Sequence, residues 1–318
     1  MRTIGTVLAT FLHWRRRRRL ANEGFSAAQI REMLTVHTET THPNWWILGG
    51  SLFFVVITLS VGLAELPYAQ EIVFVGSMSV VLFLMWRLLQ TLGPEGRQTL
   101  IGTAVVIFVF RAMPGPGAGS TWWMIDVLKF DQSFLAKLSL IASVLTLAGM
   151  FIFRRFMAER SIAYVVGFLT IAGTLLALPI IGMYYGLHLW TARLTGGLVN
   201  AHTIALIDTA LESPLGQIAM IPMLAWIANS APANLKATFF AVMASFTNLA
   251  LSASQLGTKY LNQLYIVTRE VRDPSTQQIA VPADYSALGW LLIASTVIGF
   301  SLPMLAILAA RIFRWRTA

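Results

Sequence analysis

Long apolar stretches, separated by short polar connections, recur along most of the chain. A helix needs about 20 apolar residues to cross the hydrocarbon core of a bilayer. Eight stretches approach or exceed this length, so the pattern predicts an all-α integral membrane protein with about eight transmembrane helices. The expected spans are Trp45–Glu65, Ile72–Leu92, Gln98–Met113, Gln132–Phe153, Ser161–His188, His202–Ala228, Ala237–Leu261 and Ala287–Ile312.

The third stretch is short if it stops at Met113, and the residues after it suggest how it continues. Pro and Gly alternate over Pro114–Gly117, and a second apolar stretch, Ser120–Leu128, follows. Proline lacks a backbone donor and glycine leaves the backbone exposed, so such a segment has to lie against protein or a water-filled cavity. We therefore expect a broken helix at this point.

Composition supports a membrane protein and excludes several other classes. Hydrophobic residues make up 56% of the 318 residues and charged residues 12%, whereas soluble domains are about 25% charged. The chain is therefore neither an ordinary soluble enzyme nor a disordered protein. It has no cysteine and five scattered histidines, which excludes disulfides and thiolate sites and gives no reason to expect a metal or a cofactor.

The net charge of +9 would suggest a nucleic-acid partner in a soluble protein. Here the basic residues lie at the ends of the spans, where they set topology and meet anionic lipid headgroups. If the amino terminus is cytoplasmic, sixteen of the 23 basic residues lie inside, including the run Arg15–Arg19. We therefore expect a multi-pass protein of the plasma (inner) membrane with both termini cytoplasmic, membrane lipids as partners and no nucleic acid.

No motif of enzyme chemistry stands out. The glycine-rich stretch Pro114–Gly119 lacks the Lys-Ser/Thr of a phosphate-binding loop, and we find no catalytic triad and no nucleotide fingerprint. The sequence gives no reason to expect an enzyme.

Several motifs in the second part of the chain share one resemblance. They are Phe110–Pro114, Gly119–Trp122, Leu128–Asp131, Ser213–Met223, Asn234–Ala241 and Thr247–Ala250. From about Phe110 onward, these motifs resemble the carboxy-terminal half of the folate–biopterin transporter family, which is part of the major facilitator superfamily. The stretch from Ser213 to Ala250 is the most distinctive.

The resemblance implies a fold, a domain division and a function. The last six helices would form one six-helix transporter half over residues 93–318, preceded by a cytoplasmic segment over 1–44 and an additional two-helix hairpin over 45–92. Transporters of the superfamily have two six-helix halves around a midplane site. We therefore expect a secondary carrier of folate, biopterin or related pteridines that is incomplete as a single chain and needs a second half-transporter chain. The alternative is a non-transporting membrane fragment or scaffold.

Ionisable residues inside a bilayer are costly and are functional candidates by default. Arg111 lies just before the break, where it could bind an anionic ligand or extend to the headgroups. Asp208 and Glu212 are four residues apart on one face of the sixth span. They could share a proton, pair with Arg111, or lie hydrated at the outer interface.

Three uncharged residues complete the expected substrate-binding set. Trp122 could stack on a pterin ring or lie at the membrane interface. Gln217 and Asn248 could face the substrate or form hydrogen bonds to a neighbouring helix. We expect Asp126, in contrast, to terminate the second half of the broken helix near the outer surface.

A basic connection between the fourth and fifth spans is a candidate for gating. It contains Arg154, Arg155, Glu159 and Arg160. It resembles the superfamily's loop between the second and third helices of each half, where arginines and an acidic residue pair across helix ends. The alternative is a simple cytoplasmic anchor.

Overall fold

The computed structural model describes residues 18, 45–63, 67–216, 218, 236–313 and 315. Residues 1–49 form one compact unit and residues 50–318 form another. Of the first unit, the structure describes Arg18 and the first turn of helix α3. The remaining described elements belong to the second unit.

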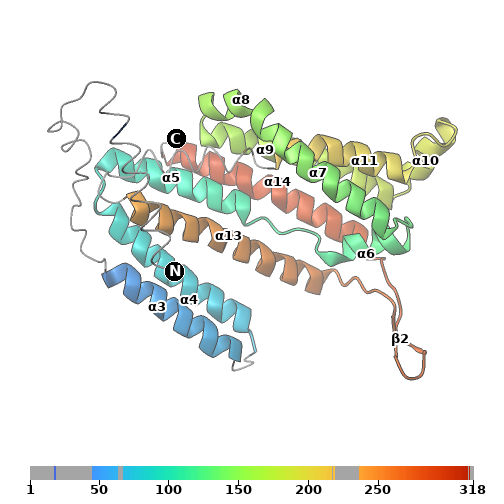
Figure 1. Cartoon of the computed structure of the whole chain (residues 1–318), viewed down its shortest axis with the longest axis horizontal. Helices are drawn as coiled ribbons and strands as arrows, with labels where there is room; N and C mark the ends of the chain where they lie inside the picture. Colours follow the sequence, from blue (N-terminus) through green and yellow to red (C-terminus); the bar gives the residue numbers. More distant parts are fainter. Residues whose placement is uncertain are drawn as a thin grey trace. The chain divides into compact units, whose positions relative to one another are not determined.

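The described elements are helical apart from one small hairpin, which confirms the predicted all-α class (Figure 1). The helices are α3 (Trp45–Leu63), α4 (Ala69–Leu89), α5 (Pro94–Arg111), α6 (Ala118–Asp126), α7 (Gln132–Ile152), α8 (Arg154–Glu159), α9 (Ile162–Tyr184), α10 (Leu187–Leu194), α11 (Ala201–Glu212), the 3₁₀ helix η1 (Ser213–Leu215), α13 (Lys236–Leu264) and α14 (Leu288–Ile312). Strands β1 (Val271–Arg272) and β2 (Ile279–Val281) pair antiparallel.

Within the described residues, five helices are long and apolar enough to cross a membrane: α4, α7, α9, α13 and α14. Helix α3 has a shorter apolar stretch, Leu48–Val61. Because a chain with five such helices has to bury them in lipid, the protein is an integral membrane protein. The predicted third and sixth spans correspond to α5, α6 and α11, which are individually shorter.

Side chains just outside the helices fix where several of them begin. Asp131 accepts a hydrogen bond from the backbone N–H of Phe134 at the start of α7. Ser161 caps α9 in the same way, and Asn200 caps α11. Each cap satisfies a backbone donor that the first helical turn leaves free.

The helices pack as two neighbouring groups, and α9 and α14 contribute to both of them. Helix α14 packs on α9 and α5, and α13 packs on α5 and α4, while α11 packs on α9 and α7 (Figure 1). One apolar core lies among α4, α5, α9, α13 and α14 and contains the fully buried Phe239 and Met243. A second core joins α6, α9, α11 and α14 around Trp123, Phe130 and Met183.

Three local features differ from the prediction. Helix α13 continues to Leu264, beyond the expected end of its span at Leu261, and the loop after it contains the β1–β2 hairpin. The chain after α9 forms a separate short helix, α10, following Gly186, whose φ of 89° ends the helical path. The predicted sixth span ends as an α-helix at Glu212, and residues 217 and 219–228 of that span lie outside the described residues.

Candidate functional site

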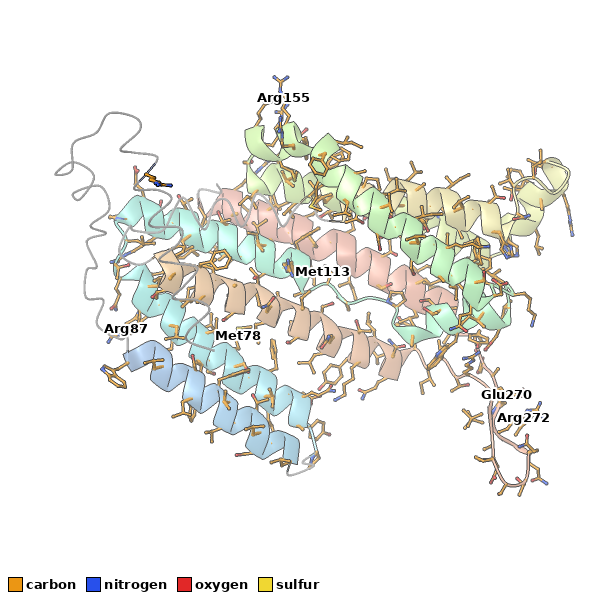
Figure 2. All side chains as sticks on the ribbon, viewed as in Figure 1. Met78, Arg87, Met113, Arg155, Glu270 and Arg272 are labelled. Carbon is orange, nitrogen blue, oxygen red and sulfur yellow. The ribbon has the colours of Figure 1, made fainter. Side chains whose placement is uncertain are left out.

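The predicted break of the third span is confirmed, because α5 ends at Arg111 and α6 begins at Ala118. The non-helical segment between them, Ala112–Gly117, is called the strap below. Two hydroxyl side chains of α13 satisfy its backbone. Ser254 Oγ donates to the carbonyl oxygen of Met113 over 2.6 Å, and the N–H of Gly115 donates to Thr258 Oγ1 over 3.0 Å. The strap therefore lies directly against α13 (Figure 2).

The remainder of the strap fits α13 closely. Asn262 Nδ2 donates to the carbonyl oxygen of Pro116 over 3.4 Å. Gly117 has a φ of 71°, and a β-carbon there would lie 2.8 Å from Asn262 Nδ2. On α13 itself, a β-carbon at Gly257 would lie 3.1 Å from Pro114 Cβ. Non-helical backbone at membrane depth is tolerated where protein supplies its partners, and α13 does so here.

Arg111 is the last residue of α5 and directly precedes the strap. Its side chain is partly buried, and its Nε is buried without a hydrogen-bond partner among the described residues. Buried donors are nearly always paired in native proteins. The Nε–H of Arg111 is therefore a buried donor whose hydrogen bond is not satisfied by the described part of the protein.

Asp208 is a second polar side chain with an unsatisfied buried atom. It is 7% exposed on α11, and its Oδ1 is buried with no hydrogen-bond partner in the described ranges of the chain. Glu212, one helical turn later, is exposed. Within the described part of the chain, no ion pair joins Arg111 to either carboxylate, so the pairing considered from the sequence is not present in this conformation.

The distinctive Ser213-Pro214-Leu215 motif holds the end of α11 in place. Ser213 Oγ donates to the carbonyl oxygen of Thr209 over 2.5 Å, and Thr146 Oγ1 of α7 donates to the carbonyl oxygen of Ser213 over 2.9 Å. Gly149 of α7 allows the backbone of Pro214 to approach it directly. The motif thus fixes the helix that carries Asp208 against α7.

The uncharged candidates lie in different environments. Trp122 is partly exposed, while its neighbour Trp123 is buried and contacts Tyr184 with ring centroids 5.8 Å apart. Asn248 is exposed on α13. Gln217 lies outside the described residues.

The basic connection forms the short helix α8. Arg155 Nε and Glu159 Oε1 pair over 2.7 Å within this helix, and Arg155 points away from the bundle (Figure 2). The Arg160 guanidinium lies 5.1 Å from the centre of the Tyr164 ring. Arg154 is exposed. These contacts are local, so within the part of the chain that the structure describes, the gating candidates do not join distant helices.

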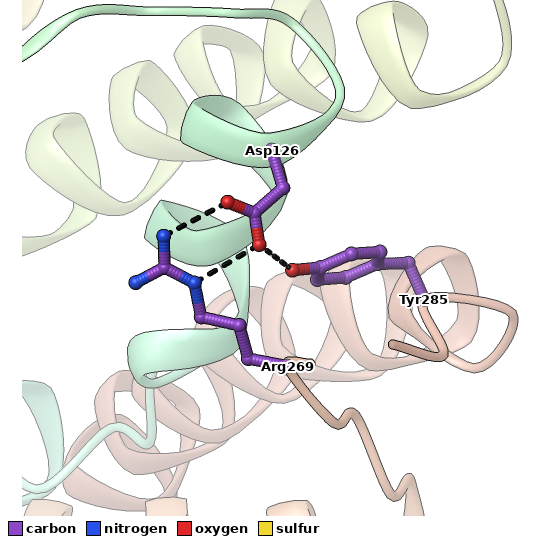
Figure 3. Close-up of polar contacts among 3 residues, drawn as sticks. All are labelled: Asp126, Arg269 and Tyr285. Carbon is purple, nitrogen blue, oxygen red and sulfur yellow. Dashed lines mark hydrogen bonds and ion pairs between the residues drawn. The ribbon is translucent and has the colours of Figure 1, made fainter. Parts of the chain in front are cut away.

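Asp126 ends α6, as expected, but its partners were not foreseen. Arg269 binds it with two hydrogen bonds of 3.0 and 2.9 Å, and Tyr285 OH donates to it over 2.5 Å (Figure 3). Burial, and then the hydrogen bond to Asp126, raise the pKa of Tyr285 to about 12. The phenol is therefore protonated at physiological pH and remains a donor.

A second polar cluster joins α4 to α13. Lys259 Nζ donates to Glu71 Oε1 over 2.6 Å, and Tyr260 OH donates to the same oxygen over 2.9 Å. Glu71 Oε2 is buried without a partner. The signal that could have found this cluster is the acidic residue at the edge of the second apolar stretch, since such a residue needs a partner in lipid.

Metal binding has no candidate among these residues. In the described ranges, no three His, Asp or Glu side chains come together in a way that could hold a metal ion.

Comparison with known proteins assigns the family. The model of the BT1 family matches residues 48–315, so the match includes α4 and most of α3 as well as the motifs after Phe110. A protein of Synechocystis sp. named folate-biopterin transporter is 27% identical over 154 residues, which are 48% of this chain and 30% of that protein. The chain thus matches less than a third of the length of this relative, and no solved structure matches it. The chain belongs to the BT1 family, the folate–biopterin transporter family that its motifs resemble.

Proposed function

We propose that this chain is one part of a secondary carrier for folate, biopterin or related pteridines, working by alternating access. The observation that carries the proposal is the buried, unpartnered Nε of Arg111 beside the strap. The name of the Synechocystis relative supports the class of substrate. In this proposal the strap and the helices around it surround the substrate route.

The chemistry of the free groups suits a flat, anionic heterocycle. The guanidinium of Arg111 can bind a carboxylate with two parallel hydrogen bonds, and its plane can stack on a ring. Asp208 can accept hydrogen bonds from amino and ring-nitrogen donors of a pteridine, and Glu212 lies one turn further along the same helix. Trp122 offers an aromatic face near the start of the same route.

The outward face of α13 supports a polar route along this helix. It exposes Ser245, Asn248 and Gln255, which recur on one side of the helix together with Leu251. The exposed face of α7 is mainly apolar, with Leu140, Val144, Leu147 and Phe151. Its exposed Ser143 donates its hydroxyl to the carbonyl oxygen of Ser139 in the same helix. Hydrocarbon disfavours amide side chains, so the α13 face is suited to water, substrate or another helix, whereas the α7 face is suited to lipid. Gln217 belongs to the proposed set by sequence alone.

A second membrane-embedded half completes the proposed carrier. Superfamily transporters form their site between two halves, and residues 93–318 would supply one of them, with the 45–92 hairpin beside it and 1–44 in the cytoplasm. The orientation with both termini cytoplasmic, in the plasma (inner) membrane, belongs to the same proposal. Arg154, Arg155, Glu159 and Arg160 would act at the cytoplasmic end during the conformational cycle.

Binding of a pteridine panel tests the proposal. The purified chain, alone and with a candidate partner half, is titrated with folate, biopterin and pterin while tryptophan fluorescence is recorded. We expect saturable binding that strengthens when the partner half is present. If no pteridine binds under either condition, the alternative of a non-transporting fragment or scaffold replaces the carrier.

Asp208→Asn is expected to change the pH dependence of uptake. If the buried carboxylate binds the coupled proton, the amide cannot, and uptake by the assembled carrier should lose most of its dependence on pH between about 5 and 8. Initial rates of uptake across that range measure the effect, with Glu270→Gln in the exposed loop after α13 as the matched control. A pH profile identical to that of the parent protein would remove Asp208 from the coupling site.

A further inference from the structure

Asp126, Arg269 and Tyr285 join three segments that are far apart in the sequence. Asp126 is the last residue of α6, Arg269 follows α13, and Tyr285 precedes α14. We infer that these three residues form a gate clamp, which keeps α6 closed against the loop between α13 and α14 and has to release before this end of the bundle opens. The purpose of the clamp rests on the proposed transport function, whereas its mechanical role can be tested separately.

The geometry of the clamp fixes both ends of the loop at once. The two parallel hydrogen bonds from Arg269 set the orientation as well as the distance of the carboxylate. The phenol of Tyr285 binds one of the same oxygens from the other end of the loop (Figure 3). A single carboxylate therefore holds α6, the exit from α13 and the entry to α14 together.

The clamp is also accessible enough to open. The side chain of Asp126 is 28% exposed and that of Arg269 is 43% exposed. Water can therefore replace the protein partners when the ion pair separates, which a fully desolvated pair would not allow without a large penalty. Such a contact can switch between made and broken states during a transport cycle.

Helix α6 is connected in a way that allows it to move as a unit. It has nine residues and follows the strap, whose backbone is not helical. The junction is Gly117, with a φ of 71° that other residues rarely adopt. Hinges absorb motion at a few residues next to rigid elements, and the junction between the strap and α6 has this form.

Helix α6 and the loop pack closely together in the closed state. Gly119 in the first turn of α6 packs on Val267 of the loop, and a β-carbon at Gly119 would lie 2.9 Å from Cγ1 of Val267. Tyr184 OH, at the end of α9, also donates to the carbonyl oxygen of Tyr285 over 3.0 Å. Opening at this end therefore has to separate Gly119 from Val267, which makes the pair a direct reporter of the closed state.

Charged contacts between segments that are distant in the sequence hold the clamp end of the bundle. At the clamp end, a second interhelical cluster, Lys259 with Glu71, joins the end of α13 to the start of α4. Helix α8 precedes the start of α9 and so lies at the opposite end from α6, which packs near the end of α9. Its Arg155–Glu159 pair is within one helix and highly exposed. Two ion pairs that join distant segments, Asp126 with Arg269 and Glu71 with Lys259, thus lie at the clamp end, which supports a conformation closed at this end.

Disulfide trapping tests the clamp. The chain has no cysteine, so Gly119→Cys with Val267→Cys gives a protein with one pair of thiols. A β-carbon at Gly119 would lie 3.1 Å from Cβ of Val267, so the two segments have to move apart by a few tenths of an ångström to reach the about 3.5–4.5 Å that a disulfide requires. We expect mild oxidation in membranes to cross-link this pair rapidly. Adding Asp126→Asn should slow cross-linking about tenfold, because two charge-assisted hydrogen bonds are weakened. The charge reversal Asp126→Arg with Arg269→Asp should restore most of the rate, and Tyr285→Phe should slow it about threefold.

Glu270→Gln is the matched control. Glu270 directly follows Arg269, but its side chain pairs with Arg272 over 2.7 Å (Figure 2). Among the described residues, it makes no ion pair with the clamp. We expect its cross-linking rate to equal that of the parent pair. A parental rate in Asp126→Asn would overturn the inference, and so would an equal slowing in Glu270→Gln, which would indicate general loosening of the loop.

If the double-cysteine variant does not fold, a single-cysteine variant provides the test. Val267→Cys alone is labelled with a water-soluble maleimide, and labelling should become about tenfold faster with Asp126→Asn. Unchanged labelling would contradict the clamp.

Uptake is measured separately: if oxidation of the pair blocks pteridine uptake and reductant restores it, the clamp is the gate of the carrier. If cross-linking depends on Asp126 but no variant takes up a pteridine, the proposed function fails and the clamp remains.

Discussion

Gly149→Ala is expected to prevent the chain from reaching its folded state in useful amounts. A β-carbon on Gly149 would lie 2.6 Å from Cα of Pro214 and even closer to its carbonyl oxygen. Both atoms are backbone atoms, so no side-chain rotation relieves the overlap. Overpacking typically costs about 1–3 kcal/mol, and a clash with backbone should reach or exceed the upper end. The yield of monodisperse protein and its thermal unfolding midpoint measure the effect.

Gly173→Ala in α9 is the matched control for this substitution. A β-carbon there meets nothing within 4 Å, and alanine favours a helix over glycine by about 1 kcal/mol. We expect the control to be as stable as the parent or slightly more stable. If Gly149→Ala has the midpoint of the control, the close approach of α7 and η1 is not required for folding.

The Gly149 contact also explains why part of the fold could be predicted. The Ser213-Pro214-Leu215 motif carried the family resemblance, and its surroundings show a physical reason for these residue types. Proline suits a turn that leaves the α-helical path, and Ser213 makes the two hydrogen bonds that hold that turn to α7 and α11. The motif was recognisable from local sequence, whereas its partner in α7 was not.

The break in the third span was predictable for a similar reason. Alternating Pro and Gly over Pro114–Gly117 cannot continue a helix, and the apolar residues on both sides showed that the chain stays at membrane depth. The sequence did not indicate which helix would satisfy the freed backbone. Ser254, Thr258 and Asn262 recur along one side of α13, but similar small polar residues occur along the rest of that helix as well.

The contacts of the charged residues were the least predictable part. Asp126 was expected to end a half-helix, which it does, yet its partner Arg269 is 143 positions away. Counting the spans predicts how deep a charged residue lies and on which side of the membrane. It does not predict which charged residues contact one another. The same limit applies to Arg111 and Asp208, for which the sequence allowed a mutual pair that the structure does not contain. Their roles in binding therefore remain predictions.

Arg111→Ala is expected to abolish uptake of pteridines by the assembled carrier while leaving insertion into the membrane intact. A hydrogen bond to a charged group contributes about 1.5–3 kcal/mol, so loss of a bidentate contact should reduce substrate affinity about a hundredfold or more. Arg111→Lys should recover only part of it, because an ammonium group neither forms the planar fork nor stacks in the same way. Arg193→Ala, in the exposed last turn of α10, is the control and should transport normally.

The stability of the Arg111→Ala variant separates binding from structure. A residue that held the fold together would make the protein less stable when removed, but the buried Nε of Arg111 has no partner to lose. Burying an unsatisfied donor costs free energy, so its removal should leave the unfolding midpoint unchanged or raise it. Loss of uptake together with an undiminished midpoint is therefore the result that a binding arginine gives. Normal uptake would assign Arg111 to the headgroups, and a large fall in the midpoint would assign it to the fold.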